Sequence, residues 1–186
     1  MVAVAVAPSN KAVAGGELDL AGAATAVRDQ VAKVRVDPAA AKGPRAAAAR
    51  AQTLPTSSGN GKRIVFDMSQ QRVWLVRENG AVRRTYPVSG STYDNLSPGT
   101  YKVYSRSRHA TSYDLGSTMG YFVRFARGDN AAIGFHDIPL DPSGKPLQSR
   151  AKLGERTSSG CVRQAHPDAV ALWRFASVGT KVVVLG

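Results

Sequence analysis

Large aromatic side chains are confined to the last two thirds of this chain, and this distribution limits where a folded core can form. The 2 Trp, 6 Tyr and 5 Phe residues all lie between Phe66 and Phe175, and residues 1–61 contain none. Aromatic side chains bury the largest areas in protein cores, so a segment without them has little to pack. We therefore expect residues 1–61 to be a flexible low-complexity leader or linker and residues 62–186 to be one folded domain.

The leader carries two features of its own. Residues 53–60 are rich in Thr, Ser, Gly and Pro, which is typical of a hinge before a folded unit. Near the start, Ala5-Val6-Ala7 has the small-x-small form that signal peptidases accept, but the apolar run around it is too short for a signal peptide and has no basic residue ahead of it. Two interpretations stay open: the chain begins inside a longer export leader, or the triplet is simple low-complexity sequence.

From Lys62 onward the apolar pattern is typical of short strands. The dipeptide Asn79-Gly80 predicts a two-residue hairpin turn in which both positions have positive φ. One helix is expected to begin at Pro167 and to end by Gly179. Many short strands with one late helix indicate a mainly β fold, a β-sandwich or partly open barrel with one short C-terminal helix. The expected strands are 63–67, 72–77, 81–88, 100–105, 121–126, 132–135 and 180–185.

Charge and cysteine content exclude several classes of protein. The formal net charge of +12 favours an anionic partner or surface. No apolar run reaches the roughly 18 residues that a membrane span needs. Because Cys161 is the one cysteine, a disulfide framework and a multi-cysteine metal site are excluded. No helix-turn-helix, zinc-finger or RNA-recognition signature supports a nucleic-acid partner, and the oligomeric state stays open.

The lone thiol lies in a segment with some of the features that a cysteine nucleophile requires. Such a nucleophile needs a lowered thiol pKa, a proton acceptor, and backbone N–H groups directed at the developing oxyanion. The small residues 158–160 before Cys161 allow a carbonyl group to approach, and Arg156 and Arg163 supply a positive field that favours the thiolate. The proton acceptor must come from another part of the chain.

Among the three histidines, His136 is the best candidate for that acceptor, because it ends an apolar strand and opens onto a loop. His166 precedes Pro167 and fits a helix entry, and His109 lies in a polar segment. From these residues alone, a buried structural cysteine with an incidental histidine is the favoured interpretation.

A family resemblance changes that balance. The segment Ile133–His136 followed by Ser158–Arg163 resembles the signature of the L,D-transpeptidase catalytic domain (YkuD-like) family, in which a strand-end His precedes Ser/Thr-His-Gly-Cys, a hydrophobic residue and Asn or Arg. The resemblance covers residues 62–186. Further matching segments, in the same order, are 64–67, 71–76, 97–101, 119–122, 168–170 and 179–184.

The resemblance implies a role for each matching residue. Cys161 would be the nucleophile and His136 its base, and the backbone carbonyl of Asp137 would orient the imidazole ring. The N–H groups of Gly160 and Cys161 would bind the oxyanion. The remaining positions that we expect near the oxyanion or the substrate are Ser158, Ser159, Arg163, Met119 and Tyr121.

Two departures from the family pattern stand out. The family often has His where this chain has Ser159, so a role assigned to that His does not carry over. The interval between His136 and Cys161 is also longer than usual, and residues 137–150 are expected to be an insertion that reshapes the mouth of the cleft.

The resemblance also implies a reaction. An L,D-transpeptidase attacks the peptide bond after diaminopimelate in a peptidoglycan tetrapeptide stem, releases D-Ala, and transfers the acyl group to an amine of a neighbouring stem. No metal or organic cofactor is expected. The implied location is the cell envelope after export, where the basic chain would meet an anionic cell wall. An L,D-carboxypeptidase with water as acceptor and a non-catalytic wall-binding protein are the alternatives.

Overall fold

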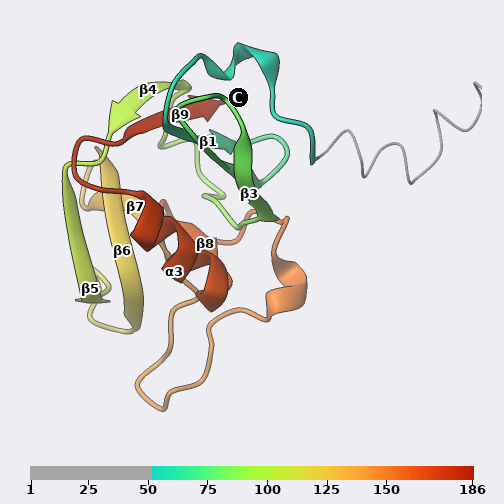
Figure 1. The fold of residues 1–186 in the computed structure, drawn as a ribbon. Helices are drawn as coiled ribbons and strands as arrows, with labels where there is room; N and C mark the ends of the chain where they lie inside the picture. Colours follow the sequence, from blue (N-terminus) through green and yellow to red (C-terminus); the bar gives the residue numbers. More distant parts are fainter. Residues whose placement is uncertain (1–51) are drawn as a thin grey trace, which may run out of the picture. The chain divides into compact units, whose positions relative to one another are not determined.

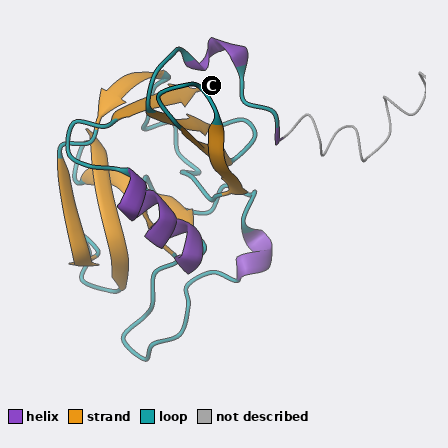
Figure 2. Cartoon of the chain, viewed as in Figure 1, coloured by secondary structure: helices purple, strands orange, loops and turns teal. Residues whose placement is uncertain are grey.

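Two β-sheets share one apolar core in the computed structural model, which describes residues 52–186 (Figures 1 and 2). The first sheet has the strand order β3-β2-β1-β9-β4 and the second has the order β5-β6-β7-β8. Residues from both sheets and from the helix α3 contribute to the core. The strands are β1 (Arg63–Asp67), β2 (Arg72–Val76), β3 (Val82–Pro87), β4 (Gly99–Lys102), β5 (Ser105–Thr111), β6 (Thr118–Arg127), β7 (Ala132–Asp137), β8 (Val162–Gln164) and β9 (Lys181–Leu185).

The α-helix that lies wholly within these residues is α3 (His166–Phe175), and two short 3-10 turns are η2 (Thr56–Ser58) and η3 (Arg150–Lys152). Helix α3 buries Leu172 and Phe175 in the core and has Pro167 in its first turn, as the sequence predicts. The mainly β fold with one short helix is confirmed. Among the described residues no helix is both long and apolar enough to cross a membrane.

Parallel pairing of β7 with β8 brings two distant segments of sequence together. In the register of this pair, Phe135 lies opposite Val162, His136 opposite Arg163 and Asp137 opposite Gln164. The strand-end His is therefore held beside the segment that follows Cys161. This pairing requires the long connection between the strands, which runs along the lower edge of Figure 1 as an orange loop.

Alternation along β7 decides which side chains face the core. Ile133 and Phe135 are buried in the shared core, with the Phe135 ring stacked on Phe125 at a centroid distance of 4.7 Å. Successive residues of a strand point to opposite faces, so Gly134 and His136 face away from that core. His136 is nonetheless only 2% exposed.

The sequence prediction differs from the structure at several places. Strand β5 and the three-residue strand β8 were not predicted, because β5 is polar and β8 is too short to show a period. The run expected at 100–105 ends at Lys102. Gly80 has φ of +81°, but Asn79 is not among the residues with positive φ.

The hairpin between β2 and β3 therefore has a longer loop than predicted. The N–H of Gly80 donates to the Arg77 carbonyl at 3.0 Å, and the N–H of Arg77 donates to the Ala81 carbonyl at 2.9 Å. This pattern is a type I turn followed by a left-handed glycine, the three-residue hairpin loop with a bulge.

Residues 52–61, which composition assigns to the linker, pack on the outer face of the five-stranded sheet. Leu54 covers a second apolar cluster that includes Val65 and Trp74. The indole Nε1–H of Trp74 donates to the Gln52 carbonyl at 3.0 Å. This segment thus stabilises the sheet from outside, while the predicted leader over residues 1–51 lies outside the described residues.

Candidate active site

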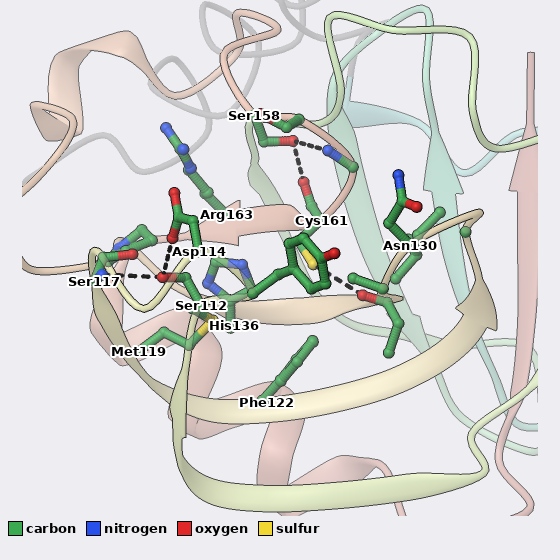
Figure 3. A pocket seen from close by; sticks show the side chains of 18 of the residues that line it. Ser112, Asp114, Ser117, Met119, Phe122, Asn130, His136, Ser158, Cys161 and Arg163 are labelled. Carbon is green, nitrogen blue, oxygen red and sulfur yellow. Dashed lines mark hydrogen bonds between the residues drawn. The ribbon is translucent and has the colours of Figure 1, made fainter.

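A cavity of about 660 Å³ lies on the face of the four-stranded sheet that is opposite the core (Figure 3). Cys161, His136 and Arg163 all line it, together with Ser158, Ser159, Gly160 and Met119. The structure therefore brings together most of the site residues that the sequence predicts. Within residues 52–186 no group of three His, Cys, Asp or Glu side chains has an arrangement that would hold a metal ion.

The imidazole ring of His136 is fixed in one tautomer. Its Nδ1 lies 2.5 Å from the backbone carbonyl oxygen of Asp137. A carbonyl oxygen only accepts hydrogen bonds, so Nδ1 carries the proton and Nε2 is the basic atom. Burial lowers the pKa of His136 to about 4, and the nearby Arg163 acts in the same direction. The ring is therefore a neutral base at neutral pH.

The thiol of Cys161 is half-buried and protonated at rest. Its Sγ lies 3.5 Å from the Ala132 carbonyl, the acceptor for the S–H. Burial raises the pKa of the thiol, and this effect exceeds the opposite effects of a backbone hydrogen bond to Gly134 and of the charges on Arg124 and Arg163. The thiolate that the sequence favoured is thus not the resting form, and the Cys161 thiol and the His136 ring are both neutral.

The sequence predicts that Arg156 and Arg163 act on the thiol, but the structure has Arg124 and Arg163 in this role. Arg156 is turned away and donates to the Met68 carbonyl at 3.3 Å. Arg124, on β6, takes its place among the cavity-lining residues and was missed by the sequence analysis. The missed signal is the alternation along β6, which places Phe122 and Arg124 on one face of the strand.

Phe122 is a second lining residue that sequence reasoning missed. Its ring lies edge-to-face with the His136 ring at a centroid distance of 5.5 Å, and the Arg124 guanidinium lies 4.1 Å above the Phe122 ring. Gly134 makes this arrangement possible, because a Cβ there would lie 2.6 Å from Phe122 Cε2 and would clash with the Val123 carbonyl oxygen. Apolar cover from Phe122 contributes to the burial of the imidazole ring.

The loop before Cys161 is held by side chains on both sides. The Ser158 hydroxyl donates to the Cys161 carbonyl and accepts a 3.3 Å hydrogen bond from the Gly160 N–H. The Nδ2 of Asn95 donates to the Ser159 carbonyl at 2.8 Å. Ser158 is therefore a loop-shaping residue, and Asn95 anchors the position at which the family often has His.

Arg163 is supported by the long loop between β7 and β8. Gln148 of this loop is buried, and its Oε1 accepts hydrogen bonds from Arg163 Nη1 at 3.3 Å and from Thr157 Oγ1 at 2.6 Å. Its Nε2 donates to Ser89 Oγ at 2.7 Å. The predicted insertion at 137–150 thus does more than line the cavity mouth, since it also fixes a basic residue of the site.

The two residues expected at the lip of the cleft separate in the structure. Met119 lines the cavity, but Tyr121 is not among the lining residues. The Tyr121 ring lies on the opposite face of β6, at centroid distances of 5.4 Å from His166 and 5.9 Å from Trp173. In place of Tyr121, the tip of the β5–β6 hairpin brings Asp114 to the cavity, as Figure 3 shows.

Several known proteins share the fold of this chain. The family model of the L,D-transpeptidase catalytic domain (YkuD) matches residues 61–184. An L,D-transpeptidase from Stackebrandtia nassauensis has 20% identity and a TM-score of 0.56, covering 75% of this chain and 64% of its own. An L,D-transpeptidase from Xylanimonas cellulosilytica has 22% identity and a TM-score of 0.54, covering 76% of this chain and 70% of its own.

A third solved structure is L,D-transpeptidase 3 from Mycobacterium tuberculosis in complex with a faropenem-derived adduct. It has 20% identity and a TM-score of 0.52, covering 69% of this chain and 61% of its own. This chain spans 60% of the length of another neighbour, an L,D-transpeptidase in complex with imipenem. The comparison with curated proteins gives no match. The family model covers about two thirds of the sequence, and the chain belongs to the L,D-transpeptidase catalytic domain family.

Proposed function

We propose that this domain is a cysteine-dependent L,D-transpeptidase that acts on peptidoglycan stem peptides. The observation that carries the proposal is the oriented, neutral His136 ring in the same cavity as the half-buried thiol of Cys161. A base whose tautomer is fixed by a backbone carbonyl and a lone thiol in the same cavity support nucleophilic catalysis by the thiol.

In the first step the Cys161 sulfur attacks the carbonyl carbon of diaminopimelate in a tetrapeptide donor. The S–H proton passes to His136 Nε2 as the sulfur–carbon bond forms, because that nitrogen is the free acceptor of the ring. The carbon–nitrogen bond to D-Ala then breaks, and Nε2 returns the proton to the leaving amine. The neutral resting pair supports concerted proton transfer, since a preformed thiolate is not favoured by burial.

Two groups around the thiol are suited to the charges of this step. The Gly160 N–H makes only a long hydrogen bond of 3.3 Å to Ser158, so it is available to a stronger acceptor such as the oxyanion. Arg163 lies in the cavity beside the thiol, where its guanidinium suits a carboxylate of the stem peptide.

In the second step an amine of a neighbouring stem attacks the thioester, His136 takes a proton from it, and the thiol leaves with a proton returned by the ring. Water in place of the amine would make the enzyme an L,D-carboxypeptidase. The enzyme would act in the cell envelope after export. From Lys62 onward the chain has 18 basic and 9 acidic residues, which suits an anionic wall.

The test is incubation of the purified protein with tetrapeptide stems, followed by mass spectrometry of the products. The proposal predicts cross-linked dimers and free D-Ala. Tripeptide with free D-Ala would identify a carboxypeptidase, and unchanged tetrapeptide would indicate a wall-binding protein without this activity. The matched control is Cys161→Ala, which changes one side chain from thiol to methyl and leaves the cavity in place.

A further inference from the structure

We propose that the carboxylate of Asp137 is a positioning residue for His136, clamped by the Gly120 N–H on one side and by His166 on the other. This inference rests on the proposed role of His136 as the base. In this proposal the Asp137 carboxylate has a function in addition to that of its backbone carbonyl. His166, which lies outside the cavity lining, helps to hold that carboxylate in place.

The contacts of Asp137 use both carboxylate oxygens. Oδ1 accepts a hydrogen bond of 2.6 Å from the Gly120 N–H, and Oδ2 accepts one of 2.9 Å from His166 Nδ1. The Asp137 side chain is 14% exposed, whereas the His166 side chain is 64% exposed. The clamp is therefore a largely buried carboxylate fixed to β6 at one oxygen and to the start of α3 at the other.

The clamp lies where backbone pairing between β6 and β7 has stopped. The ladder between these strands ends at the pair Val123 and Phe135, one residue before His136. Tyr121 has φ of +55°, a left-handed conformation that interrupts the strand. Between this point and the backbone bridge of Leu140 with Thr118, which has two hydrogen bonds of 2.9 Å, the Asp137 carboxylate connects the end of β7 to β6.

The opposite edge of β7 is held by ordinary pairing. His136 and Asp137 lie opposite Arg163 and Gln164 of β8, and the Ile138 N–H donates to the Gln164 carbonyl at 3.0 Å. With the carboxylate removed, this edge of the strand end would be tied to β6 only through the Thr118–Leu140 bridge, three residues further along the chain. The peptide group of Asp137 would then be freer to turn, and its carbonyl would hold the Nδ1–H of His136 less well.

Gly120 fits the clamp closely. A Cβ at position 120 would lie 2.9 Å from Asp137 Oδ2. A side chain there would therefore push the carboxylate away from both partners. The Arg108 guanidinium lies 5.3 Å from the centroid of the Tyr121 ring that His166 contacts.

The test measures the rate of Cys161 alkylation by iodoacetamide in the full chain from about pH 5 to about pH 9. Asp137→Ala should lower the rate near neutral pH about 10-fold, because a misplaced base loses much of its effect. The alkylation rate of the Asp137→Ala variant should rise steadily with pH, as expected of a thiol that ionises without a general base. Asp137→Asn should recover most of the rate, since its amide oxygen still accepts from Gly120.

Two further variants separate positioning from stability. Gly120→Ala should reproduce the defect without changing Asp137, and it keeps the test decisive if Asp137→Ala fails to fold. The matched control is Asp168→Ala, which removes a 13% exposed carboxylate of α3 that is paired with Arg84 at 2.6 Å. It should lower the melting temperature but leave the alkylation rate and its pH profile unchanged.

The proposal is overturned if Asp137→Ala and Gly120→Ala, both folded, alkylate within about twofold of the wild type with the same pH profile. Alkylation requires no peptidoglycan, so a wild type that leaves stem peptides unchanged would refute the proposed function without touching this result. Conversely, if Cys161 of His136→Ala is alkylated at the wild-type rate, His136 is not the base and the clamp has no role in catalysis.

Discussion

The Nδ1 of His136 donates to the backbone carbonyl of the next residue, Asp137, across 2.5 Å. A backbone carbonyl neither titrates nor rotates as a side chain does, so it fixes the tautomer of the ring at any pH where the ring is neutral. Because Nε2 is the remaining basic atom of this ring, the reactivity of the Cys161 thiol is expected to depend on His136.

The first prediction concerns this dependence. His136→Ala should lower the rate of Cys161 alkylation at pH 7 by about 100-fold, which is typical of a lost general base. His109→Ala, the matched control on the exposed strand β5, should leave the rate unchanged. His166→Ala should reduce it only a few-fold, because the Gly120 N–H still holds Asp137. A larger loss at position 166 than at position 136 would show that the base is assigned to the wrong ring.

The second prediction concerns β-lactams, which present a strained carbonyl to a nucleophile. A carbapenem should acylate Cys161 and add its mass to the intact protein, and Cys161→Ala should gain no mass. The measurement is intact-protein mass spectrometry followed by peptide mapping. An adduct that persists in Cys161→Ala would place the nucleophile elsewhere.

The third prediction follows from the buried, neutral ring of His136. Burial lowers the pKa of His136 to about 4 from an ordinary value of 6.5, so the unfolded chain binds more protons than the folded protein between these two pH values. The free energy of unfolding should therefore fall as the pH drops through this window, by about 2 kcal/mol from pH 7 to pH 5. Urea unfolding at several pH values measures this loss, and His136→Gln should remove most of it. An equal loss in the variant would mean that another group carries the effect.

The fourth prediction concerns the space beside His136. Gly134→Ala should destabilise the fold by about 1–3 kcal/mol, because its Cβ would clash with the Val123 carbonyl and with the Phe122 ring. It should also slow alkylation of Cys161 by moving Phe122 off the imidazole ring. Gly116→Ala is the control, since the atoms nearest its Cβ would belong to the Asp114 side chain, at 3.4 Å and beyond. Equal melting temperatures for Gly134→Ala and Gly116→Ala would contradict the packing argument.

The positions of the two main site residues can be predicted from the sequence, because each lies in a segment with a strong local pattern. His136 ends an apolar strand, and the small residues before Cys161 mark a tight loop, so both positions stand out without any structure. Apolar periodicity likewise finds most strands and the helix. Apolar periodicity does not identify β5, a polar and partly exposed edge strand, or β8, which has only three residues.

Relationships that depend on the folded arrangement of distant segments are not visible in the sequence. The pKa of the Cys161 thiol is one case, because nearby arginines suggest a thiolate whereas burial by the folded loops raises the pKa. Tyr121 is another, because its positive φ interrupts the alternation of β6 and its ring packs on Trp173 outside the cavity. The support of Arg163 by Gln148 requires the loop to fold back, which no local pattern predicts.

Cys161 is proposed to form an acyl-enzyme with a peptidoglycan donor. The most direct measurement is the intact mass of the protein after rapid mixing with a tetrapeptide stem and acid quenching, in the wild type and in Cys161→Ala. We expect a wild-type adduct equal in mass to the stem without D-Ala, located on the Cys161 peptide, and no adduct in the variant. Free D-Ala released by both proteins at equal rates, with no adduct on either, would contradict it.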